Sequence, residues 1–322
     1  MIRICAIVAF ALTLCGEPQT DSGQAFTNVS EALLLQFDKH DLVALGEWHN
    51  SREDQDLRIN LIRNPQFPKR VRNIVVECGN ALYQETLDRF IAGVDLPKEE
   101  IQDVWRDTTQ SPVGGGDSPA CEEFLNEVRS INLKLPNPLK LRVLAGDPPI
   151  DWGKINSAEE FQRFLRTRDE FAAQLVAREI VGKKSKGLLV YGAGHLWRNN
   201  ALNPARNLAS LLDRSNPGSL FTVVRLGGIY PDTPRLESVM PKSRPAFLFL
   251  KGTPAATLDA NEFIGRGIPV KLFAAGLGIG QVADACVYSG QREDMPIAPY
   301  APDPAYEKEK QRRQAFMPQP RH

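Results

Sequence analysis

Histidine is scarce in this chain, and neither sign of charge is in excess. The 322 residues include four histidines, and 39 Lys and Arg balance 39 Asp and Glu, so the formal net charge at pH 7 is +0. A chain without a basic excess has no electrostatic basis for nucleic acid or an anionic membrane surface as its main partner. The hydrophobic fraction of 42% is that of an ordinary globular protein, which argues against wholesale disorder.

Several well-known motifs are also absent. The sequence has no Cys-x-x-Cys, no His-Glu-x-x-His, no Gly-x-Ser-x-Gly and no P-loop. These absences argue against a zinc ribbon, a zincin-type protease, a serine-nucleophile elbow and a P-loop NTPase. Gly276–Gly280 has the start of a dinucleotide-binding turn, but Gln281 stands where the last glycine of that pattern is expected. We interpret this stretch as a loop.

Cysteine is sparse outside the N-terminal region. Of the five cysteines, Cys5 and Cys15 lie near the N-terminus, which leaves Cys78, Cys121 and Cys286. Three cysteines allow one disulfide in an oxidising compartment, and the sequence does not determine which two would pair.

An apolar run at the N-terminus predicts export. Met1–Arg3 supplies one positive charge, Ile4–Cys15 is almost wholly apolar, and small and polar residues follow. This order is typical of a secretory signal, and the run is too short to cross a bilayer comfortably. We therefore expect residues 1–25 to be a signal peptide. Leu12–Cys15 also resembles a lipobox, so the mature protein would be periplasmic or secreted, or a membrane-anchored lipoprotein lipidated at Cys15. A buried N-terminal helix is the alternative.

Further along, apolar stretches of strand length alternate with stretches of helical periodicity. The expected strands cover residues 42–45, 73–77, 141–147, 187–191 and 220–226, with late strands at 247–250 and 283–288. This alternation predicts an α/β fold, with a mostly parallel sheet flanked by helices, over residues 28–290. Residues 291–322 are Pro-rich and then charged, and we expect them to form a loosely held C-terminal tail.

Acidic residues and histidines stand at the ends of the first four strands. Glu47 and His49 belong to the first strand, Glu77 to the second, Asp147 to the third and His195 to the fourth. The first and fourth strands both continue as Gly-x-x-His. Each group alone is more often a helix cap or a structural hydrogen-bonding residue. Because the carboxyl ends of parallel strands line one crevice, we expect the five side chains to converge there and interpret them together as an active site.

Such a cluster supports two kinds of chemistry. Glu47, His49, Glu77, Asp147 and His195 could hold a divalent metal, zinc or manganese, whose bound water becomes nucleophilic near neutral pH. Without a metal, a histidine can activate water while a carboxylate holds its tautomer and raises its basicity. In either case Glu47, His49, Glu77 and His195 are the candidate catalytic residues.

These motifs resemble those of a superfamily that comprises the erythromycin esterases, the ChaN-type haem-binding lipoproteins and the Tiki/TraB proteins. The resemblance covers roughly residues 30–290, and the stretch 284–290 is closest to the ChaN-like branch. The motifs that carry it are Gly46–His49, Glu77 after an apolar strand, Asp147, Arg168–Asp169 on a long helix, and Gly192–His195.

The resemblance implies an α/β fold with its site at the strand ends, formed by Glu47, His49, Glu77 and His195. The branches differ in chemistry: the esterases open a lactone with a histidine-activated water, Tiki-like members are metal-dependent peptidases, and ChaN-like members bind haem. The Gly-x-x-His spacing fits the ChaN and Tiki branches and argues against macrolide hydrolysis. Our leading hypothesis is an exported, metal-assisted hydrolase acting on a small-molecule or peptide substrate. The alternative is a non-catalytic haem- or metal-binding surface protein of the ChaN type.

Overall fold

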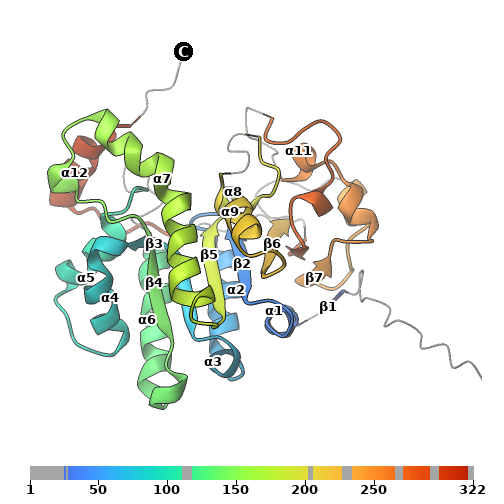
Figure 1. The fold of residues 1–322 in the computed structure, drawn as a ribbon, viewed down its shortest axis with the longest axis horizontal. Coiled ribbons are helices and arrows are strands. Elements are labelled where there is room, and N and C mark those ends of the chain that lie inside the picture. Colours follow the sequence, from blue (N-terminus) through green and yellow to red (C-terminus); the bar gives the residue numbers. More distant parts are fainter. Residues whose placement is uncertain are drawn as a thin grey trace, which may run out of the picture.

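The computed structural model is built around one twisted sheet (Figure 1). It describes residues 25–26, 28–110, 118–201, 206–226, 234–264, 271–290 and 297–317. The eight strands lie in the order β1-β7-β8-β6-β2-β5-β3-β4. The strands from β8 to β4 are parallel, while β7 runs antiparallel to β8 and β1 antiparallel to β7. Their bounds are β1 Ala25–Phe26, β2 Leu42–Glu47, β3 Asn73–Asn80, β4 Arg142–Asp147, β5 Gly187–Gly192, β6 Leu220–Leu226, β7 Ala246–Phe249 and β8 Ala285–Tyr288.

Strand β2 occupies the middle of the parallel part and sets the register of its neighbours. It pairs along its whole length with β5, so that Glu47 lies beside Gly192, and on its other edge it pairs with β6. All residues of β5 and β6 are buried. Burial on both faces explains why these strands read as unbroken apolar runs rather than as alternating ones. The predicted α/β fold with a mostly parallel sheet is confirmed.

Helices cover both faces of the sheet (Figure 1). On β2, Val43 and Leu45 pack with residues of α1, α2, α4, α5 and α6, whereas Leu42 and Ala44 pack with residues of α7 and α9. The two sets alternate because successive strand residues point to opposite faces. The helices are α1 Val29–Gln36, α2 Arg52–Arg63, α3 Phe67–Arg70, α4 Gln84–Ile91, α5 Lys98–Arg106, α6 Pro119–Lys134, α7 Ala158–Val176, α8 Ala193–Leu196, α9 Leu208–Ser215, α10 Pro234–Glu237, α11 Ala260–Phe263 and α12 Pro304–Gln314.

The C-terminal segment differs from the expected loosely held tail. Its helix α12 packs on the domain, where Arg313 forms an ion pair with Asp107 at 2.6 Å and lies over the ring of Trp152. The residue before the helix, Asp303, forms an ion pair with Arg106 at 2.9 Å. The helix has no apolar stripe and is held by ion pairs and by stacking of arginine on aromatic rings. A search for apolar periodicity cannot find a helix of this kind.

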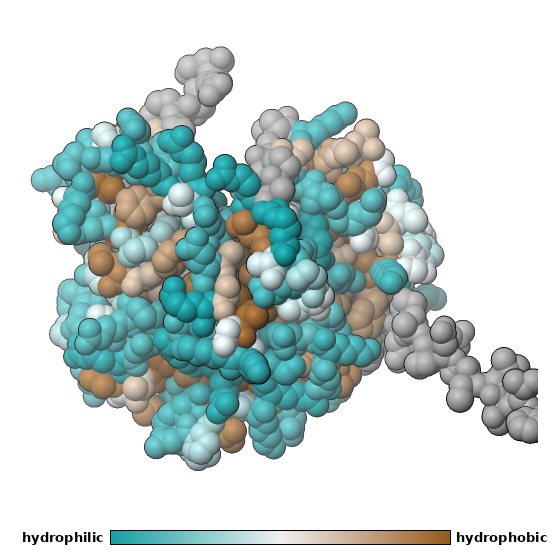
Figure 2. All heavy atoms as spheres, in the orientation of Figure 1, coloured by the Kyte–Doolittle hydropathy of each residue, from teal (hydrophilic) through white to brown (hydrophobic). Residues whose placement is uncertain are grey.

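The surface on the side shown in Figure 2 is mainly hydrophilic, with apolar side chains in small groups. Among the helices in the described ranges, none has the length and apolarity needed to cross a membrane. Apart from its last residue, the predicted signal peptide lies outside those ranges, and so does the possible lipidation site Cys15. Export therefore stays a prediction at this point.

Candidate active site

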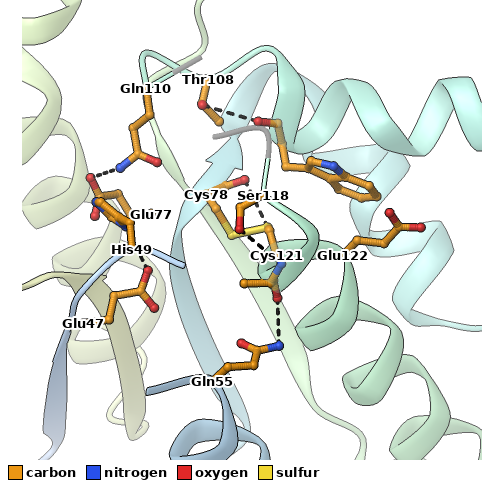
Figure 3. The surroundings of a disulfide bond; sticks show 12 residues. Glu47, His49, Gln55, Glu77, Cys78, Thr108, Gln110, Ser118, Cys121 and Glu122 are labelled. Atoms are coloured by element: carbon orange, nitrogen blue, oxygen red, sulfur yellow. Dashed lines mark hydrogen bonds and ion pairs between the residues drawn. A yellow bond between two sulfur atoms is a disulfide. The ribbon is translucent and has the colours of Figure 1, made fainter. Parts of the chain in front are cut away.

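The carboxyl ends of β2, β3 and β5 bring Glu47, His49, Glu77 and His195 together. Glu47 is the last residue of β2, and His49 follows in the turn before α2. Glu77 lies where the pairing of β3 with β4 shifts register, and His195 lies in the short helix α8 directly after β5. Figure 3 shows Glu47, His49 and Glu77 side by side. Four of the five side chains that were expected to converge thus lie together in the fold, while the catalytic role of these residues stays a prediction.

His195 lies between two carboxylates. Its Nε2 is 3.0 Å from Glu77 Oε1, and its Nδ1 is hydrogen-bonded to Asp169 on α7. Burial disfavours the imidazolium, but the charges of Glu77 and Asp169 outweigh that effect and raise the pKa of His195 to about 9. With a proton on each nitrogen, this ring has no lone pair and does not serve as a general base at neutral pH.

Glu77 is a buried carboxylate whose two oxygens are both engaged. Oε1 faces His195 and accepts a hydrogen bond from the side-chain amide of Gln110, while Oε2 accepts one from the backbone N–H of Gly192. Burial alone would raise the pKa of Glu77, but the His195 imidazolium, and to a lesser extent His49, hold that pKa well below its usual range. Glu77 is therefore a fixed negative charge at the centre of the cluster.

His49 is the accessible histidine of the cluster, with a side chain that is 38% exposed. Its Nδ1 lies 3.1 Å from Glu47 Oε1. This contact assigns the proton to Nδ1, because the carboxylate can only accept, and leaves a lone pair on Nε2. Nε2 packs against Gly192, where an added Cβ would lie 2.8 Å from Nε2 and 3.1 Å from Glu77 Oε2. Only glycine at this position leaves room for the ring beside Glu77.

Arg58 contacts Glu47, the partner of His49, and the sequence did not identify it as a site residue. Its guanidinium donates to Glu47 Oε2, and it lies 5.4 Å from the centre of the Phe124 ring. Burial lowers the pKa of Arg58, an effect that the charge of Glu123 opposes. The helical spacing of α2 could have indicated that Arg58 is buried. Arg58 lies three residues before Leu61 and four before Ile62, so it shares their buried face.

Asp147 is the predicted site residue that the structure keeps apart from the other four. Both of its oxygens accept hydrogen bonds from Thr109, including one from the backbone N–H at 2.7 Å. Burial raises the pKa of Asp147 to about 7, against the lowering effect of these hydrogen bonds. In the part of the chain that the structure describes, Asp147 holds the Thr108–Gln110 segment rather than contacting a histidine.

The donor set does not fit the predicted divalent metal. Within the described ranges, no three His, Cys, Asp or Glu side chains are placed to hold a metal ion. The contacts of the residues point the same way. Both nitrogens of His195 face carboxylates, both oxygens of Glu77 accept from N–H groups, and Asp147 is bonded to Thr109.

The structure has two adjoining hollows, and the smaller one borders the cluster at Glu47 and Arg58. A cavity of about 920 Å³ is lined by residues of α1, α2, β8 and the loop around Arg244, and also by Arg225. A pocket of about 20 Å³, bounded by Glu47, Arg58 and Arg225, shares several of these lining residues. The pocket has room for about one water molecule.

A disulfide joins the strand that carries Glu77 to the start of α6 (Figure 3). Its partners are Cys78 and Cys121, with 6.3 Å between their Cα atoms. Cys286 is free and buried, and burial raises the pKa of its thiol to about 12. The structure thus selects one of the pairings that the sequence left open.

The sequence matches no family model and no curated protein. A protein of Bacillus cereus with a solved structure is 13% identical and aligns over 86% of this chain and 94% of its own, with a TM-score of 0.55. A variant of the erythromycin esterase EreC in its open conformation is also 13% identical and aligns over 83% and 95%, with a TM-score of 0.51. The chain has the fold of the erythromycin esterases.

This likeness confirms the predicted fold, while membership of the predicted superfamily stays a prediction. The haem-binding protein ChaN of Campylobacter jejuni, 12% identical, aligns over 61% of this chain and 85% of its own with a TM-score of 0.34, a value on which no argument can rest. One fold hosts many activities, so the activity has to be argued from the site itself. Whether the chain is closest to the ChaN-like branch stays a prediction.

Proposed function

We propose that this protein is a hydrolase in which His49 activates a water molecule without a bound metal. One observation carries the proposal: the two histidines of the cluster differ in what their ring nitrogens contact. His195 is held as an imidazolium between Glu77 and Asp169, whereas His49 is accessible and its Nδ1 contact with Glu47 leaves Nε2 free to accept a proton. A general base needs such a lone pair within reach of the water.

The reaction follows from these positions. His49 Nε2 takes a proton from the water, and the water oxygen attacks the carbonyl carbon of an ester or amide. The new imidazolium is stabilised by Glu47 on one side and by the fixed charge of Glu77 on the other. Arg58 holds Glu47 in place through its hydrogen bond to Oε2. When the tetrahedral intermediate collapses, His49 returns its proton to the leaving group.

The proposal includes export. The Cys78–Cys121 disulfide supports it, because disulfides persist in the oxidising compartments outside the cytosol. The apolar run of residues 1–25 supports it independently. N-terminal sequencing of protein secreted or anchored by the native host tests this part, and an intact Met1 would contradict it.

Haem binding is the second candidate function, and the exposure of His49 favours it. A half-exposed imidazole with a free Nε2 is suited to be an axial ligand of haem iron. The haem would then lie outside the buried Glu77–His195 pair. This candidate needs no water activation. A substitution of His49 would therefore remove hydrolysis under the first proposal and haem binding under the second.

Hydrolysis of p-nitrophenyl acetate by the purified full-length chain, followed before and after treatment with EDTA, tests the leading proposal. We expect turnover to persist after EDTA and to be lost in His49→Gln, with His40→Asn as the control because His40 lies before β2 and away from the cluster. Turnover that disappears with EDTA and returns with zinc or manganese would overturn the metal-free mechanism. A Soret band on adding haemin that vanishes in His49→Gln would instead support the haem-binding candidate.

A further inference from the structure

Gln110 is a residue of the cluster that the proposed mechanism does not yet use. It follows Thr109, and its side chain lies above Glu77 (Figure 3). Its Nε2 donates a hydrogen bond to Glu77 Oε1. The residue is only 4% exposed. Although buried, its Oε1 accepts no hydrogen bond from the part of the protein that the structure describes.

The carboxylate fixes which way the amide faces. Rotating the amide by half a turn would place Gln110 Oε1 against the ionised Glu77, two acceptors facing each other. The N–H side must therefore face Glu77, and the carbonyl must point elsewhere. Buried carbonyl oxygens without a donor are rare in proteins, and each needs an explanation such as a bound water or a ligand.

The proposed reaction supplies a donor for this oxygen. A water that gives one hydrogen to His49 Nε2 needs a second acceptor to fix its orientation. Glu77 is not available, because His195, Gln110 and Gly192 already direct N–H groups at its two oxygens. His49 and Gln110 both border Glu77, and Gln110 Oε1 is the acceptor still without a partner in this part of the site.

We propose that Gln110 is a positioning residue whose Oε1 accepts a hydrogen bond from the water that His49 activates. The proposal rests on the function proposed above. With one O–H directed to His49 Nε2 and the other to Gln110, a lone pair of the water oxygen is left to face the substrate carbonyl. In the reaction the first O–H bond breaks and its proton moves to Nε2, while a C–O bond forms and the carbonyl electrons move onto the carbonyl oxygen. The second O–H stays intact throughout.

The kinetic test uses Gln110→Met, which keeps the length of the side chain but removes both polar atoms. We expect kcat for p-nitrophenyl acetate to fall about 100-fold with KM little changed, because the loss concerns the orientation of the attacking water. Gln36→Met is the matched control, since Gln36 is equally buried but donates to Ala32 within α1. A loss that appears in KM alone would overturn the water assignment, and so would a loss confined to substrates that carry a hydroxyl or amide donor.

A crystal structure of the substrate-free protein tests the proposal without relying on activity. We expect an ordered water within hydrogen-bonding distance of both Gln110 Oε1 and His49 Nε2, and its loss in Gln110→Met. A protein donor on Oε1, such as the nearby Arg168 whose charge acts on Glu77, would overturn the proposal, and so would an empty position. If the water is present but the protein hydrolyses no ester or amide, the proposed function fails while the water site stands.

Discussion

At the scale of single residues, the two histidines differ because of what their nitrogens contact. Both lie three residues after a glycine near the end of a strand. His195 is enclosed by Glu77 and Asp169, whereas His49 is bound on one side only, by Glu47. The ion pairs of His195 raise its pKa from 6.5 to about 9. They therefore contribute stability that is fully present below about pH 6.5 and is lost as the pH rises through about 9.

His195→Gln should remove the pH dependence of stability that the His195 ion pairs cause. We expect the free energy of unfolding of the wild type to fall between about pH 6.5 and 9, and that of His195→Gln to start lower and fall less over the same interval. Urea unfolding across this interval measures both. Asp147, whose pKa is raised to about 7, titrates in both proteins, so its contribution cancels in the difference between them. Parallel pH profiles for the two proteins would show that His195 is not held as an imidazolium.

Gly192 offers a second prediction at this scale. A Cβ at Gly192 would lie 2.8 Å from His49 Nε2, so Gly192→Ala should displace the ring and reduce kcat by about 100-fold. Gly194→Ala is the matched control, because an added Cβ there meets no atom within 4 Å. Ester hydrolysis by the two variants measures the effect. Equal activity in both would mean that His49 does not need its position beside Glu77.

The same scale shows what the sequence could and could not predict. Glu47, His49, Glu77 and His195 were found because they stand at the ends of apolar strands, and strand ends share one edge of a parallel sheet. Arg58 and Gln110 reach the cluster from a helix and from a loop. Their approach is decided by how these elements pack on the sheet, and no local pattern encodes that packing.

At the scale of elements, the Cys78–Cys121 disulfide holds β3 and α6 together beside the site. The two cysteines are 43 residues apart in sequence. A loop of this size corresponds to about 4 kcal/mol of stabilisation when only the entropy of the unfolded chain is considered. The bond also fixes the residue after Glu77, so it links global stability to the geometry of the cluster.

We expect Cys78→Ser, or reduction with dithiothreitol, to lower the free energy of unfolding by about 4 kcal/mol and to reduce turnover. Denaturant unfolding and ester hydrolysis, with and without the reductant, measure the two effects. In Cys78→Ser the reductant should have no further effect, which makes the variant its own control. A wild type that is equally stable and active in dithiothreitol would contradict the prediction.

At the scale of the whole molecule, the strand order explains the place of the site. From β2 the chain moves to β3 and β4 on one side of the sheet, and it later reaches β6 and β8 on the other. Crevices form where the order of a parallel sheet reverses in this way. The alternation of strands and helices predicted the parallel sheet, but not which strands are neighbours. Neighbours depend on contacts between segments far apart in the sequence.

Helix α12 shows how a distant segment can act on that crevice. Arg313, whose side chain is 5% exposed, forms an ion pair with Asp107 and lies over Trp152. The indole N–H of Trp152 donates to the carbonyl of Thr108, which begins the segment that places Thr109 on Asp147 and Gln110 on Glu77. The C-terminal helix thus supports the loop that borders the proposed water site.

Arg313→Met, which keeps an apolar stem but removes the guanidinium, should lower the free energy of unfolding by about 3 kcal/mol because Asp107 loses a buried partner. It should also reduce kcat, since the support of the Thr108–Gln110 segment is weakened. Arg163→Met is the control, because Arg163 pairs with Glu159 on the exposed side of α7 and such pairs contribute little. Denaturant unfolding and ester hydrolysis of both variants measure the effects. A variant at Arg313 that loses stability but keeps full turnover would show that α12 stabilises the fold without acting on the site.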